Sequence, residues 1–192
     1  MNKIRDSVRA VALAMLAVVG TSAAAETMKA PRACFDVVCT DKDGNVKWRD
    51  VSYNLVTTVG KNDLLDKYLA GSAYTAAWFC GLISSVSYTA IAAADTMASH
   101  AGWTEAGATN APNYTGNRPA LAFAAASGGS KATSSASSFT FSQAGTIKGM
   151  FANSVTTKDG TTGVLYNAVL FSGGDRTVAI NDVVNVSVTY SA

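Results

Sequence analysis

The chain has 192 residues, of which 48% are apolar and 15% are charged, so it is long enough to form one domain with a substantial core. It holds 15 basic and 13 acidic residues; the three basic and one acidic residue within positions 1–25 leave 12 of each in the remainder. Because the remainder of the chain has no net charge, it lacks the excess of basic residues that binds DNA or RNA, so we expect no nucleic-acid binding.

Residues 1–28 read as an N-terminal segment separate from the rest, and two interpretations remain open. In the first, Met1–Ala25 is a secretory signal: basic residues precede the apolar run Ala10–Val19, and Ala23–Ala25 resembles a cleavage site. The run is too short for a permanent membrane anchor. A protein with this signal would be exported once the signal is cleaved.

In the second interpretation, the same segment is an arm that packs on a neighbouring subunit. Its apolar residues follow a 4-3-4-3 spacing, which is typical of a helical seam and is compatible with a helix over about residues 3–19. The residues of this seam are Ile4, Val8, Val11, Met15 and Val18. An arm of this kind implies no association with a membrane.

The first elements of the body are two predicted strands joined by a tight turn. Cys34–Thr40 and Val46–Val51 both have the composition of strands, and Asp41–Asn45 contains the Asp-Gly step that favours a hairpin turn. Asp41, Asp43 and Asn45 alternate as in a calcium-binding loop. The later glutamate of such a loop is missing, so the turn is the preferred interpretation.

One short α-helix is predicted over about residues 62–70, with Asn62 or Asp63 as its N-cap. Gly71 can adopt the left-handed conformation that ends a helix. The apolar residues of this segment share one face and are expected to close the end of a β structure: Leu64, Leu65, Tyr68 and Leu69.

The remaining sequence is dominated by strand patterns. Two segments are apolar at both odd and even positions and predict central strands: Tyr74–Ile83 and Val164–Phe171. A further strand is predicted over Pro119–Ala126. Apolar and polar residues alternate over residues 184–190, which predicts a half-exposed strand. We count about eight to ten strands at the short spacing typical of all-β folds. The pattern predicts a single domain over residues 33–192, built as an antiparallel sandwich or barrel.

The three cysteines Cys34, Cys39 and Cys80 cannot all pair within one chain. Cys34 and Cys39 lie on one predicted strand and point to opposite faces, so they cannot bridge each other. We interpret all three as small apolar residues with free thiols.

No catalytic, cofactor-binding or metal-binding constellation is recognisable. His100 is the only histidine, no G-x-S-x-G motif accompanies it, and a metal site needs more ligands at regular spacing. Trp48, Trp78 and Trp103 are interpreted as core or interface anchors. We therefore expect a protein that is not an enzyme and needs no cofactor.

Five segments together resemble a family of small virion proteins of tailed bacteriophages, labelled head cement or decoration proteins and in some cases tail-fibre proteins. The segments are residues 44–83, 95–107, 117–123, 156–178 and 182–192, and the longest contains the sequence VGKNDLLDKYLAG. The resemblance covers about residues 33–192; residues 1–28 depart from it.

This resemblance implies a jelly-roll-like β-sandwich that binds the outside of the capsid shell. The expected partner is the phage major capsid protein, the expected assembly is a homodimer or homotrimer, and the expected location is the virion, after assembly in the host cytoplasm. We expect contacts from Ile4, Val8, Val11 and Met15 in the N-terminal segment, and from Trp103 and Tyr114 in the loops at 95–118.

Two alternatives belong to other classes of protein. A tail or fibre module that binds a receptor or glycan would use exposed Tyr88, Trp103 and Tyr114 to stack on sugars. A secreted periplasmic β-sandwich protein is the third interpretation, and it requires cleavage of Met1–Ala25.

Overall fold

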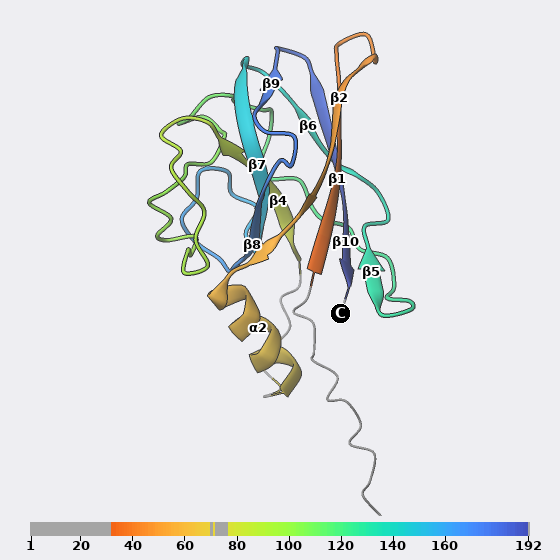
Figure 1. Cartoon of the computed structure of the whole chain (residues 1–192), viewed down its shortest axis with the longest axis vertical. Coiled ribbons are helices and arrows are strands. Elements are labelled where there is room, and N and C mark those ends of the chain that lie inside the picture. Colours follow the sequence, from red (N-terminus) through yellow and green to blue (C-terminus); the bar gives the residue numbers. More distant parts are fainter. Residues whose placement is uncertain (1–31, 70, 72–76, 192) are drawn as a thin grey trace, which may run out of the picture.

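A computed structural model of the chain describes residues 32–69, 71 and 77–191. In this part, ten β-strands form two five-stranded antiparallel sheets, accompanied by one α-helix, α2 (Figure 1). The sheets are separate rather than closed on each other. The predicted antiparallel β-sandwich is therefore confirmed, and the barrel alternative is wrong. The expected helix over residues 3–19 lies outside the described residues.

Sheet A has the strand order β2-β1-β10-β5, with β6 also paired to β10. Its strands are β1 (Arg32–Thr40), β2 (Val46–Tyr53), β5 (Ser130–Ala132), β6 (Ser137–Thr140) and β10 (Val183–Ser191). Residues on the outer face of β1 and β10 are mostly exposed or half-buried, whereas the alternate residues are buried. One face of sheet A therefore meets solvent, as the alternation in the last strand predicted.

Sheet B has the strand order β3-β8-β7-β4, with β9 also paired to β7. Its strands are β3 (Leu55–Val56), β4 (Phe79–Ser84), β7 (Gly145–Asn153), β8 (Leu165–Leu170) and β9 (Arg176–Val178). Five residues in succession are buried in β4, and five in β7. Sheet B is therefore covered on both faces.

Two clusters of side chains explain this difference between the sheets. The larger fills the space between sheets A and B and includes Phe35, Val37, Leu82, Phe139 and Val186. The smaller lies on the other face of sheet B, where the long loop between β4 and β5 packs over it; it consists of Ile83, Met97, Trp103, Phe151, Leu165 and Ala168.

The turn between β1 and β2 forms as predicted. The Asp41 carboxylate accepts hydrogen bonds from the backbone N–H groups of Asp43 and Asn45, each at 2.9 Å, and Gly44 has a φ of +85°. The hydrogen bonds to Asp41 are those of a turn. The tip of this hairpin lies at the opposite end of the sandwich from α2 (Figure 1).

β4 differs from its prediction in position and extent. It begins at Phe79 rather than Tyr74, and it is the last strand of sheet B rather than a central one. Its free edge is covered by loop backbone, through bonds from Cys80 N to Pro119 O and from Ala106 N to Leu82 O. Because loop backbone covers this edge, β4 has the apolar sequence of a central strand although it is an edge strand.

The predicted strand over Pro119–Ala126 is wrong. This segment runs along the edge of β4 and makes only isolated bridges, such as Phe79 with Ala120.

α2 spans Thr58–Leu69 and begins earlier than the predicted residue 62. Thr57 is the N-cap, because its Oγ1 accepts a hydrogen bond from Gly60 N at 3.1 Å. Gly71 has a φ of +69°, the left-handed conformation expected for it.

The expectation that the apolar residues of α2 close the sandwich is wrong. Gly60 is the buried residue of α2, where the first turn rests on the backbone of Tyr166 in β8. Beyond that turn the helix projects from the sandwich, and four large apolar side chains remain exposed: Leu64, Leu65, Tyr68 and Leu69.

The three cysteines have free thiols, as expected. Cys39 and Cys80 are fully buried, and burial raises the pKa of the Cys39 thiol to about 11 and that of Cys80 further still. Both thiols therefore serve as small core residues.

Candidate functional site at one end of the sandwich

The exposed apolar residues of α2 form two rows along the helix. Residues four apart lie above one another on a helix, so Leu64 stands over Tyr68 and Leu65 stands over Leu69. The first row lines a groove between α2 and the sheets. The second row, the helix ridge of Leu65 and Leu69, is 52% and 73% exposed and takes no part in lining the groove.

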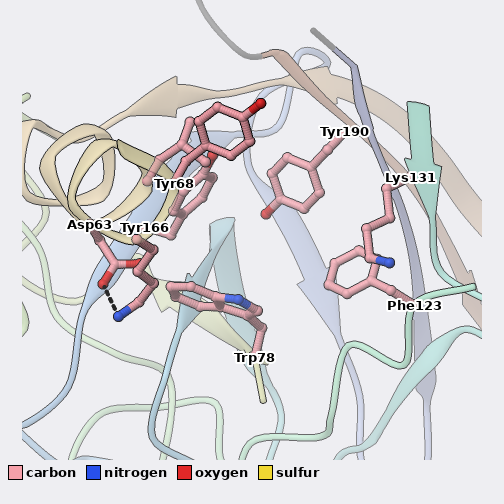
Figure 2. Close-up of a pocket in the computed structure, with 9 residues that line it drawn as sticks. Asp63, Tyr68, Trp78, Phe123, Lys131, Tyr166 and Tyr190 are labelled. Atoms are coloured by element: carbon pink, nitrogen blue, oxygen red, sulfur yellow. Dashed lines mark ion pairs between the residues drawn. The ribbon is translucent and has the colours of Figure 1, made fainter. Parts of the chain in front are cut away.

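The groove, which we call the aromatic groove, has a volume of about 380 Å³ (Figure 2). It lies where β8 and β10 come together near α2, so both sheets contribute to it. The residues that line it are Asp63, Leu64, Lys67, Tyr68, Trp78, Phe123, Lys131, Tyr166 and Tyr190.

Four aromatic rings make a continuous wall around the aromatic groove. Trp78 meets Tyr166 edge-on at 5.3 Å between ring centroids, and Tyr166 meets Tyr190 edge-on at 5.5 Å. Phe123 continues the wall at 5.6 Å from Tyr190. All four rings pack against the main core but are only partly buried, so apolar surface is exposed at this end of the sandwich.

The charged groups at the rim of the groove already have partners. Lys67 pairs with Asp63 at 3.2 Å, one helical turn away, and Lys131 Nζ donates to the carbonyl oxygen of Ala124 at 2.8 Å. Lys131 Nζ also lies 6.0 Å from the centre of the Phe123 ring. The site therefore combines an apolar wall with a rim that holds one ion pair and one ammonium group bonded to a carbonyl oxygen.

Local sequence patterns gave no sign of this groove. Trp78, Phe123, Tyr166 and Tyr190 come from four separate segments, and each reads by itself as a core residue. The apolar residues of α2 point to this end of the molecule, but their pattern predicts a buried face rather than an exposed one.

Trp103 and Tyr114 do not lie at a contact surface, which corrects the prediction from sequence. Each is 1% exposed. Trp103 Nε1 donates to Asp95 Oδ2 at 2.9 Å, and its ring stacks on His100 at 4.0 Å between centroids. Tyr114 packs edge-on against Phe139 at 4.9 Å.

These two aromatic residues are buried because their loop folds back over the sandwich, so neither can stack on a sugar or meet a capsid protein. The other predicted contacts, Ile4, Val8, Val11 and Met15, lie outside the described residues.

A buried ion pair fixes the loop that carries these residues. Arg118 donates to both carboxylate oxygens of Glu105, from Nε at 2.9 Å and from Nη2 at 2.7 Å. Burial raises the pKa of the Glu105 carboxyl, and the Arg118 guanidinium opposes that effect. Arg118 also donates to the carbonyl oxygens of Val155 and Gly160, which ties two loops together.

A smaller cavity of about 140 Å³ lies beside this ion pair and includes His100, Glu105 and Asp159 in its lining. His100 Nδ1 is 2.9 Å from the Trp103 carbonyl oxygen, and Asp159 Oδ2 accepts from Ala108 N at 2.9 Å. These contacts are structural. Within the described residues, no group of three or more His, Cys, Asp or Glu side chains is arranged to hold a metal ion.

Asp50 joins the two sheets at the middle of β2. Its carboxylate accepts from Ser172 N and Gly173 N, each at 2.9 Å, and from Arg176 Nη2 at 2.7 Å. Burial raises the pKa of this carboxyl, but the hydrogen bonds from Ser52, Arg176 and these backbone groups outweigh burial and lower the pKa to about 2.

Comparison of the chain with protein-family models finds no matching family, and comparison with curated proteins finds no matching relative. Within the described residues, no helix combines the length and the hydropathy needed to cross a bilayer.

Proposed function

We propose that this protein is a non-enzymatic structural protein of a phage virion. In this proposal it decorates the outside of the major capsid shell as a homodimer or homotrimer and stabilises the shell. The observation that carries the proposal is the helix ridge: Leu65 and Leu69 are exposed on a helix whose buried residue, Gly60, lies in its first turn.

The energetics of the helix ridge support attachment to another protein. Burying a leucine side chain fully contributes about 1.5–3 kcal/mol, so two leucines supply a modest contact in a single copy. Many copies on a symmetric shell convert modest contacts into firm attachment, because each bound copy restricts its neighbours in the same oligomer.

The charge balance and the sequence resemblance add support of a different kind. The chain beyond residue 25 has equal numbers of acidic and basic residues, so bringing copies close together on a shell carries little electrostatic cost. Residues 44–83, which resemble the decoration family most extensively, include the whole of α2.

The attachment surface is tested with the double variant Leu65→Ser/Leu69→Ser. Both side chains are exposed, so we expect the variant to keep its unfolding temperature while its affinity for particles that lack the protein falls at least about tenfold. Val46→Ser is the matched control: Val46 is 51% exposed and lies at the hairpin end, far from α2. Binding is measured by co-sedimentation with particles.

The stabilising role is tested by heating particles with and without the protein, or by diluting them abruptly into low salt. We expect particles that lack the protein to release DNA at a lower temperature. Equal retention of DNA would refute the role in stabilisation. If antibodies label phage tails rather than heads, the tail or fibre interpretation replaces the capsid proposal. If a secreted protein begins at Glu26, the exported protein is the favoured interpretation.

A further inference from the structure

The aromatic groove contains polar groups that the described residues leave unused. Neither Trp78 Nε1 nor the Tyr166 hydroxyl has a hydrogen-bond partner in the part of the chain that the structure describes. Figure 2 shows the Tyr190 hydroxyl directed toward the space between Trp78 and Tyr166. Neither group is among the buried atoms without a partner, so solvent reaches both, and each can exchange its bond to water for a bond to a ligand that carries hydroxyl groups.

A buried amide supports the Tyr190 hydroxyl from behind. Asn167 is fully buried, and its Nδ2 donates to Tyr190 Oη at 2.9 Å. Because the hydroxyl accepts this bond, its own proton remains available to an acceptor in the groove. Asn167 Oδ1 is buried without a partner among the described residues, and Asn167 does not line the groove, so the amide acts on the groove through Tyr190.

We propose that the aromatic groove binds a neutral sugar residue. A pyranose ring has an apolar face of C–H groups that packs on aromatic rings, and an edge of hydroxyls that both donate and accept hydrogen bonds. Trp78 and Tyr166 supply the ring surfaces and a donor each, and Tyr190 supplies a third donor. The volume, about 380 Å³, lies at the lower end of the range for ligand sites and suits one or two sugar rings.

The charged groups at the rim make contacts of their own and are not needed to bind the ligand. Asp63 and Lys67 compensate each other at 3.2 Å, and Lys131 is bonded to the Ala124 carbonyl oxygen. Lys131 keeps two further N–H donors, so the neutral character of the proposed ligand rests on the three uncharged donors of Trp78, Tyr166 and Tyr190 rather than on these charges.

This inference is independent of capsid attachment. The groove is lined by Leu64 and Tyr68, whereas the proposed attachment surface is the helix ridge of Leu65 and Leu69. Sugar binding is measured on the isolated protein, so either proposal can fail while the other stands.

The experiment is ligand-observed NMR on the full chain with the methyl glycosides of glucose, galactose and N-acetylglucosamine, and with p-cresol as a neutral aromatic probe that has no sugar ring. We expect at least one glycoside to bind saturably with a Kd of about 1 mM. Trp78→Phe, which keeps a ring but removes the indole N–H, is expected to weaken binding roughly tenfold. Tyr166→Phe and Tyr190→Phe are each expected to weaken it roughly three- to tenfold.

Trp48→Phe is the matched control, because Trp48 lies outside the groove and its Nε1 donates to the Thr177 carbonyl oxygen. It should bind the sugar as the unaltered chain does, and Leu65→Ser/Leu69→Ser should too. Circular dichroism confirms that each variant is folded. The proposal is overturned if no glycoside saturates, if Trp78→Phe binds normally, or if p-cresol alone binds and loss of the tyrosine hydroxyls has no effect. The last result would identify the groove as an apolar docking site for a protein.

Discussion

Asp50 holds β2 against the turn that follows β8, and its ionised form is the one that the fold stabilises. The pKa of this carboxyl is about 2 in the folded chain, against about 3.9 in an unfolded one. Ionised Asp50 therefore contributes stability above about pH 4, and that contribution is lost as the pH falls toward 2.

We expect Asp50→Asn to lower the free energy of unfolding by about 1–3 kcal/mol near neutral pH, because the bond to Arg176 loses its charge. The difference from the unaltered chain should narrow between about pH 4 and pH 2. Urea unfolding of both proteins at a series of pH values measures this difference in the free energy of unfolding. Asp36→Asn, on the exposed face of β1, is the control. A difference that does not depend on pH would contradict the assignment.

The Glu105–Arg118 pair makes a sharper case, because both side chains are almost fully buried. Arg118→Met should lower the free energy of unfolding by about 3–5 kcal/mol, since it leaves a carboxylate buried without its partner. Adding Glu105→Gln should restore a large part of that loss. Chemical denaturation of the two single variants and the double variant measures the coupling, and strictly additive losses would show that the pair is not coupled.

Three loop residues, His100, Trp103 and Tyr114, show what can be predicted for single side chains and what cannot. The sequence offers no catalytic or metal-binding partner for His100, and in the structure one of its ring nitrogens lies at hydrogen-bond distance from a carbonyl while the ring stacks on Trp103. The prediction placed Trp103 and Tyr114 at the surface because their segment has loop composition. Composition cannot tell a loop in solvent from a loop that covers a sheet.

The contact between α2 and β8 depends on the absence of a side chain at Gly60. A Cβ atom there would lie 2.2 Å from the Tyr166 carbonyl oxygen and 2.8 Å from its Cα. Gly60→Ala should therefore lower the free energy of unfolding by about 1–3 kcal/mol through overpacking. Helix propensity alone predicts the opposite sign, a gain of up to about 1 kcal/mol.

Thermal unfolding of Gly60→Ala decides between these signs. Asn62→Ala, at an exposed position of the same helix, is the control for propensity and should be neutral or slightly stabilising. A raised unfolding temperature in Gly60→Ala would mean that the helix can move away from β8 without cost.

The start of α2 shows what local signals miss. Asn62 and Asp63 are good capping residues, yet Thr57 caps the helix, because its side chain and backbone are also held by β8 through Leu165 and Tyr166. The same long-range contact makes Gly60 the buried residue of the helix. Neither fact could be derived from the helix sequence, since β8 lies about a hundred residues further along the chain.

The fold class followed from strand alternation and turn chemistry, which are local. The hairpin at Asp41–Asn45 and the free cysteines were predicted for the same reason. The pairing of ten strands into two sheets, and the meeting of Trp78, Phe123, Tyr166 and Tyr190 in one groove, depend on long-range packing. A single sequence carries no direct record of that packing, so the aromatic groove emerged only from the structure.

The tip of the hairpin between β1 and β2 and the helix α2 mark the two opposite ends of the sandwich. β1 runs for nine residues, about 30 Å, from the end that carries α2 to the hairpin tip (Figure 1). If the α2 end faces a shell, residues 42–44 point outward, and they are exposed in a turn held by the side chain of Asp41. A peptide inserted there would be displayed on the outside of every decorated particle, and this position is therefore a natural choice for presenting an epitope or an affinity tag.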